Sequence, residues 1–272
     1  MTPGRSYGIT EAPATPADPA LALALEELAR NGFTALEQAI APPVVAEMRG
    51  ALDRLLAAQT ARFGGPERLG RINDAGQARA LLEEEPVFLE LLRQPRLDAV
   101  VEALLGAAAL VMQQNGIVMP PEAAEHHQQS WHRDLPYQMW VASKPIALGA
   151  LCALDDFTVE SGATFFLPGS HLHAQFPSTA YAERWAMRAL APAGSIVVFD
   201  AMCFHRGGRN LGQRPRRAVN TLFGVPLLAQ QVAFTAKPGM DAKLRRRLGL
   251  DYQPQPSADA WREARWQRVV GE

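Results

Sequence analysis

The sequence predicts a single domain in which α-helices flank a core of antiparallel β-strands, arranged as a sandwich or a barrel. The chain has 272 residues, of which 48% are hydrophobic and 20% are charged, a composition typical of folded globular proteins. Apolar residues recur at helical spacing near both ends of the chain. Between these ends, short β-rich runs are separated by Gly, Pro and Asp rather than by helices, which argues against a parallel βαβ sheet.

The elements are expected in four successive segments of one domain spanning residues 1–272. Residues 1–19 contain four prolines and are predicted to form a loose lead. Residues 20–106 are expected to be mainly helical, and residues 107–230 to form the β core. Residues 239–270 carry two more helical patterns, and we expect these helices to pack on the exterior of the sheet.

The β core is defined by five apolar runs in chain order. They are "LVMQQNGIVM", "PIALGALCALDDF", "ATFFLPGSH", "GSIVVFDAMCFH" and "RAVNTLFGVPL". Residues 177–190 form an insertion with a helical pattern between two of these runs. A long insertion near an active site often serves as a lid.

The net charge of the chain and the length of its longest apolar run limit the kinds of partner that we expect. The 27 basic and 28 acidic residues leave a net charge of -1, which does not suggest nucleic acid or an acidic membrane, so a small-molecule substrate fits better. The longest apolar run, Ile146–Leu154, is too short to cross a bilayer, and no clear leader is present, so a cytoplasmic location is expected. Cys152 and Cys203 are expected to be reduced core residues. The sequence gives no indication of the oligomeric state.

The stretch "QSWHRD" at residues 129–134 is the first candidate for chemistry. If it is extended, His132 and Asp134 point to one face and Arg133 to the other. Two imidazoles and one carboxylate on one face are the usual ligands of an oxygen-activating Fe(II). His205, at the end of a buried run, is the candidate for the second imidazole. The structural alternative is a strand end whose His and Asp bond internally.

A second element lies downstream, in "FHRGGRNLGQRPRRAVN". Arg216 stands eleven residues beyond His205, at the start of the next β run. Its guanidinium could hold a carboxylate through a two-pronged, charge-assisted hydrogen bond.

Taken together, "SWHRD", "ESGATFFLPGSH" and "FHRGGRN" followed by "RPRRAVN" resemble the phytanoyl-CoA dioxygenase family of iron- and 2-oxoglutarate-dependent oxygenases, over residues 32–226. The resemblance implies a double-stranded β-helix, which is a cupin-like jelly-roll of two sheets, with helices packed outside. It also implies Fe(II), 2-oxoglutarate and O2 as cofactors.

Carried onto this sequence, the resemblance makes His132, Asp134 and His205 the iron ligands and Arg216 the clamp for the distal carboxylate of 2-oxoglutarate. Arg217 is the rival clamp, because strand alternation lets only one of the two arginines face inward.

Weaker expectations concern further contacts to 2-oxoglutarate. Thr164 matches a family position whose hydroxyl assists cosubstrate binding, and Gln129 or Ser130 could do likewise. Asn115 is a further possibility.

The remaining histidines and the residues that flank the motifs are expected to serve structure. His126, His127, His171 and His173 are read as loop or turn residues, and Arg245, Arg246 and Arg247 as a solvated helix face. Five residues flank the metal motifs and are expected to contribute mostly packing, with substrate contact as the alternative: Trp131, Tyr137, Trp140, Phe157 and Arg206.

The resemblance therefore predicts hydroxylation of a small-molecule metabolite or natural-product intermediate, with release of succinate and CO2, and it leaves a related desaturation, epoxidation or ring-forming oxidation open. Related halogenases have Ala or Gly at the position of Asp134, so chlorination is not expected. Two alternatives stay open: a cupin-type metal enzyme that does not use 2-oxoglutarate, and a non-catalytic β-barrel binding protein.

Overall fold

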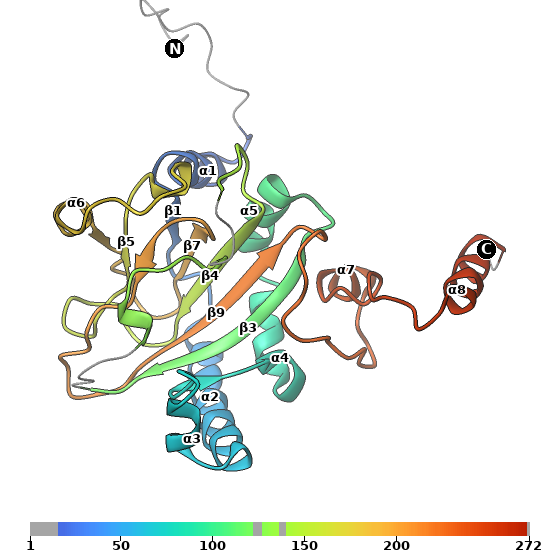
Figure 1. Ribbon diagram of the computed structural model, residues 1–272, viewed down its shortest axis with the longest axis horizontal. Coiled ribbons are helices and arrows are strands. Elements are labelled where there is room, and N and C mark those ends of the chain that lie inside the picture. The colour runs from blue at the N-terminus through green and yellow to red at the C-terminus, as the bar shows by residue number, and fades with distance from the viewer. Residues whose placement is uncertain (1–15, 122–126, 136–139, 271–272) are drawn as a thin grey trace, which may run out of the picture.

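A computed structural model of the chain describes residues 16–121, 127–135 and 140–270. Its strands form two antiparallel sheets, a large one of six strands and a small one of three. Figure 1 shows the long strands β3, β9 and β4 side by side across the middle of the molecule, with β5 to one side and α7 to the other. Within the described residues these strands do not close into a barrel.

The helices lie mostly before the sheets in the chain. They are α1 (Pro19–Asn31), α2 (Pro42–Phe63), α3 (Pro66–Gly70), α4 (Leu81–Glu84), α5 (Pro95–Leu105), α6 (Thr179–Trp185), α7 (Ala242–Arg247) and α8 (Ala258–Val270), with short 3-10 turns η1 (Pro86–Leu91), η2 (His127–Gln129) and η3 (Ser170–Leu172). Local signals explain the bounds of α1: the Asp18 carboxylate accepts from the amide of Ala20 at 2.9 Å, and Gly32 ends the helix at φ +84°.

The large sheet has the strand order β1-β7-β4-β9-β3-β2, and the small sheet has the order β6-β5-β8. The strands are β1 (Phe33–Leu36), β2 (Gln77–Ala78), β3 (Leu110–Met119), β4 (Ala147–Ala153), β5 (Phe165–Phe166), β6 (Met187–Arg188), β7 (Ile196–Asp200), β8 (His205–Arg206) and β9 (Arg216–Gly224).

Side-chain alternation along β4 shows how the layers stack. Leu148, Ala150 and Cys152 pack into a core shared with the helices, whereas Leu151 and Ala153 face a second core that includes Phe166 of the small sheet. The molecule therefore has three layers: helices, the large sheet and the small sheet. Residues that face inward between the two sheets are candidates for a site.

Several sequence expectations need correction at this level. The segment expected to be mainly helical also holds β1 and β2, which the sequence analysis missed because runs of four and two residues give no clear strand period. The expectation that α8 packs on the sheet was wrong: α8 has no buried side chain among those described, and Figure 1 shows it away from both sheets. The expectation of a fully solvated Arg245–Arg247 face was also wrong, because Arg247 is 4% exposed.

The expectation that both cysteines are reduced core residues agrees with the structure. Cys152 and Cys203 are both free and buried, and burial raises the pKa of each thiol to about 12. No helix in the described ranges combines the length and the apolar character that crossing a membrane requires.

Candidate metal and cosubstrate site

The segment that carries His132 and Asp134 is fastened to the small sheet by backbone hydrogen bonds. His132 forms an isolated antiparallel bridge with His205, and each amide donates to the other's carbonyl at 3.0 Å. The Asp134 amide donates to Ala201 O at 3.1 Å. The segment is thus a short extra strip beside β8, and His132 and His205 are direct neighbours.

Arg133 fastens the same strip from its other face. The guanidinium donates to Met202 O at 2.8 Å, Ala174 O at 2.7 Å and Ser170 O at 3.2 Å, and it also bonds to the carbonyl of His173. It lies 3.8 Å from the centre of the Phe204 ring. Although Arg133 is charged, it is only 7% exposed, so it acts as a buried anchor between the two predicted ligands.

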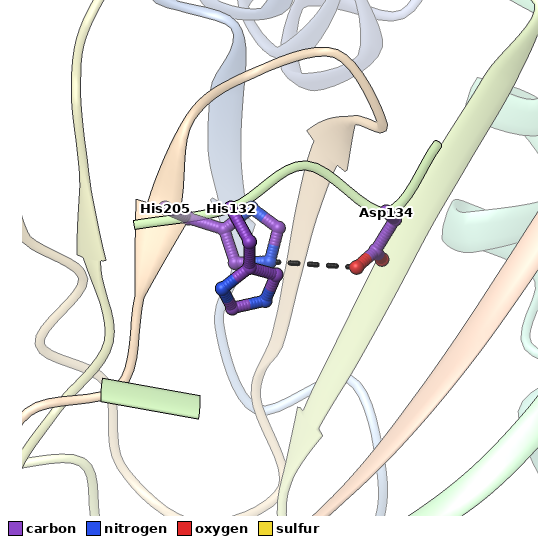
Figure 2. Close-up of side chains that lie close together, drawn as sticks. All are labelled: His132, Asp134 and His205. Carbon is purple, nitrogen blue, oxygen red and sulfur yellow. Dashed lines mark ion pairs between the residues drawn. The ribbon is translucent and has the colours of Figure 1, made fainter. Parts of the chain in front are cut away.

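The side chains of His132, Asp134 and His205 converge, as Figure 2 shows. One ligand atom from each lies within 4.8 Å of the others, and His205 Nε2 is 3.5 Å from Asp134 Oδ1. His132 Nδ1 lies 2.8 Å from Ser130 O, and His205 Nδ1 lies 3.0 Å from Cys203 O. A carbonyl can only accept, so each Nδ1 carries the proton in these bonds, which leaves Nε2 of each imidazole as the nitrogen that can bind a metal.

The Asp134 carboxylate is almost enclosed, and its surroundings favour the ionised form. Burial by itself raises its pKa, but hydrogen bonding and charge from His205, the charge of His132 and the amide of Asn220 together hold the pKa below its usual value. Asn220 Nδ2 donates to Asp134 Oδ2 at 3.2 Å. An anionic carboxylate beside two imidazoles that each offer Nε2 is a donor set that suits a divalent transition metal.

Arg216 and Arg217 at the start of β9 face opposite sides of the large sheet. Arg217 points toward the helices and pairs with Asp53 at 2.7 Å and Asp155 at 3.2 Å. Arg216 is 4% exposed and points between the sheets, where it bonds to the carbonyl of Gly162. Its Nε has no hydrogen-bond partner within the described chain. Burial lowers the pKa of Arg216 to about 10, so it remains a cation at neutral pH.

A small cavity joins Arg216 to the His205 ring. Its walls are formed by Ile117, Gln128, Leu151, Thr164, Phe199, His205, Gly207, Arg216, Ala218 and Asn220. The cavity therefore has a cationic end, a polar rim and apolar sides. This pattern of charges suits a small diacid, with one carboxylate at the guanidinium and its other end toward His205.

The structure separates the weaker sequence candidates. Thr164 lines the cavity, whereas Gln129 and Ser130 are not among its walls. Ser130 is exposed and contributes its carbonyl to His132, and Gln129 has a buried Nε2 without a partner in the described residues. Asn115 is buried on β3, directly opposite Asn220.

Gln128 and Asn220 line the cavity but were missed by the sequence analysis. Asn220 could have been found, because it stands four residues after Arg216 and alternation places both on one face of the strand. Gln128 had no such signal, because it lies in the turn η2.

Three of the five residues that flank the motifs take part in contacts between an arginine and an aromatic ring. Arg206 lies 5.2 Å from the Trp131 ring, and Arg216 lies 5.1 Å from the Phe157 ring, while Trp140 is exposed. His171 is buried in η3 and His173 is exposed. Tyr137 and His126 lie outside the described residues.

Comparisons with known proteins show which family and which fold the chain is similar to. Residues 28–218 match the family model described as phytanoyl-CoA dioxygenase. A protein of Mycobacterium tuberculosis, Rv1501, is 32% identical over 181 residues, and this match covers 64% of the chain and 65% of Rv1501. The ectoine dioxygenase of Nocardia farcinica is 25% identical, with 71% of the chain and 74% of that enzyme covered.

Among solved structures, the chain shares its fold with SnoN, described as a non-heme alpha-ketoglutarate-dependent epimerase from nogalamycin biosynthesis. The TM-score is 0.61 at 23% identity, covering 89% of the chain and 98% of SnoN. Another structure of SnoN holds Fe3+, alpha-ketoglutarate and nogalamycin RO. The family match spans well over half of the sequence, and it confirms the resemblance seen in the motifs. The chain belongs to the phytanoyl-CoA dioxygenase family, whose members use Fe(II), 2-oxoglutarate and O2.

Proposed function

We propose that the chain is a non-haem Fe(II)- and 2-oxoglutarate-dependent oxygenase that hydroxylates a small-molecule metabolite or natural-product intermediate. The observation that carries the proposal is the convergence of His132, Asp134 and His205 beside the buried guanidinium of Arg216. Membership of the family supports the same cofactors. We extend the proposal to the architecture: one cytoplasmic domain whose two sheets form a double-stranded β-helix.

In this proposal each residue has a defined task. His132 and His205 hold the iron through Nε2, and Asp134 holds it through a carboxylate oxygen. Arg216 binds the distal carboxylate of 2-oxoglutarate, and the Thr164 hydroxyl in the same cavity donates to it. With O2, the bound iron and 2-oxoglutarate supply the oxidising power for attack on a C–H bond, with succinate and CO2 as the coproducts.

The protein around the cavity positions these groups and keeps water out. The Phe199 ring lies 4.8 Å from the His205 ring and the Phe166 ring lies 5.5 Å from it, so the imidazole is held between aromatic surfaces. Leu151 and Phe199 form apolar walls. A nearly dry site strengthens the pairing of Arg216 with a carboxylate, because charges interact more strongly where the dielectric is low.

Anaerobic titration tests the class of enzyme. Adding Fe(II) and then 2-oxoglutarate to the full chain should produce the metal-to-ligand charge-transfer band of the chelate. The band should be lost in His132→Ala and His205→Ala and retained in His171→Ala, a change at a buried histidine outside the metal group. Metal binding without the band would favour a cupin-type enzyme that does not use 2-oxoglutarate. No metal binding would favour a non-catalytic binding protein.

Product analysis tests the type of reaction. This test is needed because the chain shares its fold with an epimerase, so hydroxylation is not the sole outcome to consider. Small molecules are screened for those that stimulate formation of succinate, and each active one is then incubated with isotopically labelled O2. Hydroxylation places the label in the product. Epimerisation would leave the mass of the substrate unchanged, and desaturation would remove two hydrogens.

A further inference from the structure

Asn220 lies on the inner face of β9, between the predicted cosubstrate clamp and the predicted iron ligands. It follows Arg216 by four residues and faces the same side. Its backbone neighbours are Asn115 on β3 and Leu151 on β4. The large sheet thus places the Asn220 amide beside the carboxylate of Asp134, which belongs to a different segment of the chain.

The two oxygens of Asp134 have different partners. Oδ1 lies 3.5 Å from His205 Nε2, on the side where the imidazoles converge. Oδ2 accepts a hydrogen bond from Asn220 Nδ2 at 3.2 Å. A carboxylate can bind a metal through one oxygen or through both, and a donor bonded to one oxygen favours binding through the other.

We infer that Asn220 is a positioning residue for the metal centre: its amide holds Asp134 Oδ2, so that the carboxylate presents Oδ1 alone to the ion. This inference rests on the proposed function and deepens it. A carboxylate that binds through one oxygen leaves more coordination positions open for cosubstrate and O2.

The surroundings of Asn220 argue against a role in packing alone. Its inward neighbours along β9, Ala218 and Leu222, are apolar and belong to cores. Asn220 Oδ1 is buried and has no hydrogen-bond partner among the described residues, which costs stability that a leucine would not cost. An amide retained at such a position needs a reason, and the bond to Asp134 supplies one.

The test compares two substitutions at adjacent positions of β9. Asn220→Leu removes the donor to Asp134 while keeping the side-chain size. Thr221→Val is the matched control, because Thr221 faces the helices and accepts from Gln114 Nε2 at 3.1 Å, so it also loses one buried hydrogen bond. The readouts are Fe(II) affinity by anaerobic titration, the position of the charge-transfer band with 2-oxoglutarate, and thermal unfolding.

We expect Asn220→Leu to bind Fe(II) on the order of 10- to 100-fold more weakly than the wild type, with a shifted band. Thr221→Val should keep both properties, although it unfolds at a lower temperature. Asn220→His, which retains an N–H donor at similar reach, should recover most of the affinity.

Three results would overturn the inference. One is an unchanged affinity and band in Asn220→Leu when the wild type shows both, which would leave the proposed function intact. Another is an equal loss of affinity in Asn220→Leu and Thr221→Val, which would mean general damage to β9. The third is a wild-type chain that binds neither Fe(II) nor 2-oxoglutarate, and in that case the proposed function fails as well.

Discussion

The two sheets that meet at the site are held together in different ways. In the large sheet, β3 and β9 have ten and nine residues and pair along almost their whole length. In the small sheet, β5, β6 and β8 have two residues each, and His132 adds only a single bridge. The large sheet has long ladders of backbone hydrogen bonds, whereas the small sheet and the ligand strip have few and depend more on anchors made by side chains.

The difference teaches how the site is assembled. The large sheet contributes Arg216 and Asn220 through regular alternation along one strand. The small-sheet side contributes His132, Asp134 and His205 from short segments, with Arg133 as the anchor that joins the strip to Met202 O and to the loop after β5. A lost side chain on the large sheet should therefore delete one contact, and a lost anchor on the small-sheet side should disturb the metal site as a whole.

The largest expected effect comes from Arg133→Met. The change leaves several buried carbonyls without a donor, so we expect the free energy of unfolding to fall by about 4 kcal/mol. Fe(II) affinity should fall about tenfold or more, because the strip that carries His132 and Asp134 loses its anchor. Urea unfolding and anaerobic Fe(II) titration measure the two effects.

Arg247→Met is the matched control for that prediction. Arg247 is as buried as Arg133, and it donates to Ala109 O at 2.9 Å and pairs with Asp98 at 2.8 Å, on the side of the large sheet away from the metal site. A similar loss of stability is expected, because Asp98 loses its buried partner. Fe(II) affinity should not change. If both variants lost affinity equally, the proposed contrast between the two sheets would be wrong.

The next largest effect concerns the two adjacent arginines of β9. Arg216→Met should weaken 2-oxoglutarate binding by about 100-fold or more, because the cosubstrate loses a charge-assisted hydrogen-bond partner in a buried site. Fe(II) affinity and stability should change little, since Arg216 bonds only to the carbonyl of Gly162 among the described residues. The measurement is the intensity of the charge-transfer band as 2-oxoglutarate is added.

Arg217→Met should give the reverse pattern. Arg217 pairs with Asp53 and Asp155 on the helix side of the sheet, so its loss lowers stability and leaves cosubstrate affinity unchanged. A large fall in 2-oxoglutarate affinity in this variant, with Arg216→Met unaffected, would reassign the clamp to Arg217.

The four central strands of the large sheet could be predicted from the sequence, because their residues form clear β-rich runs. The runs that form β3, β4, β7 and β9 are five to ten residues long, rich in apolar residues and bounded by turn residues. The small sheet leaves little trace, because strands of two residues are set by tertiary contacts rather than by local preference. The run that ends at His205 shows this: it divides into β7 in the large sheet and β8 in the small one, with a turn between them.

The residues of the site also differ in whether the sequence could predict their roles. His132, Asp134 and Arg216 could be singled out because their residue types and spacing point to a chemistry. Alternation along β9 could have placed Asn220 on the same face as Arg216, but its bond to Asp134 could not be predicted, since that carboxylate lies 86 residues earlier and only folding brings it near. Arg247 was misread for a related reason: three consecutive charges suggest solvent, although helical geometry turns one of them toward the protein.

The smallest expected effect is a pH dependence of stability caused by Asp200, at the point where the chain passes from the large sheet to the small one. Asp200 ends β7 and is 7% exposed, and its Oδ1 accepts from the amide of Met202 at 2.8 Å. Burial raises the pKa of this carboxyl to about 6, against the opposing effects of the Met202 amide and the charge of Arg133. The folded chain therefore keeps a proton that the unfolded chain loses near pH 4.

The sign of the pH dependence follows from that difference. Below about pH 4 both states hold the proton, so Asp200 carries no electrostatic cost. As the pH rises from about 4 to about 6, only the unfolded state is ionised, so wild-type stability falls by roughly 3 kcal/mol and then levels off. Asp200→Asn does not ionise and should escape this loss, so its stability relative to the wild type should rise across the same window.

Urea unfolding of both proteins at several pH values measures the difference in stability between them, and the contributions of other titrating groups cancel in that difference. A difference that stays constant from pH 4 to pH 7 would mean that Asp200 is hydrated or ion-paired in the folded protein, and that the junction between the sheets is more open than its burial implies.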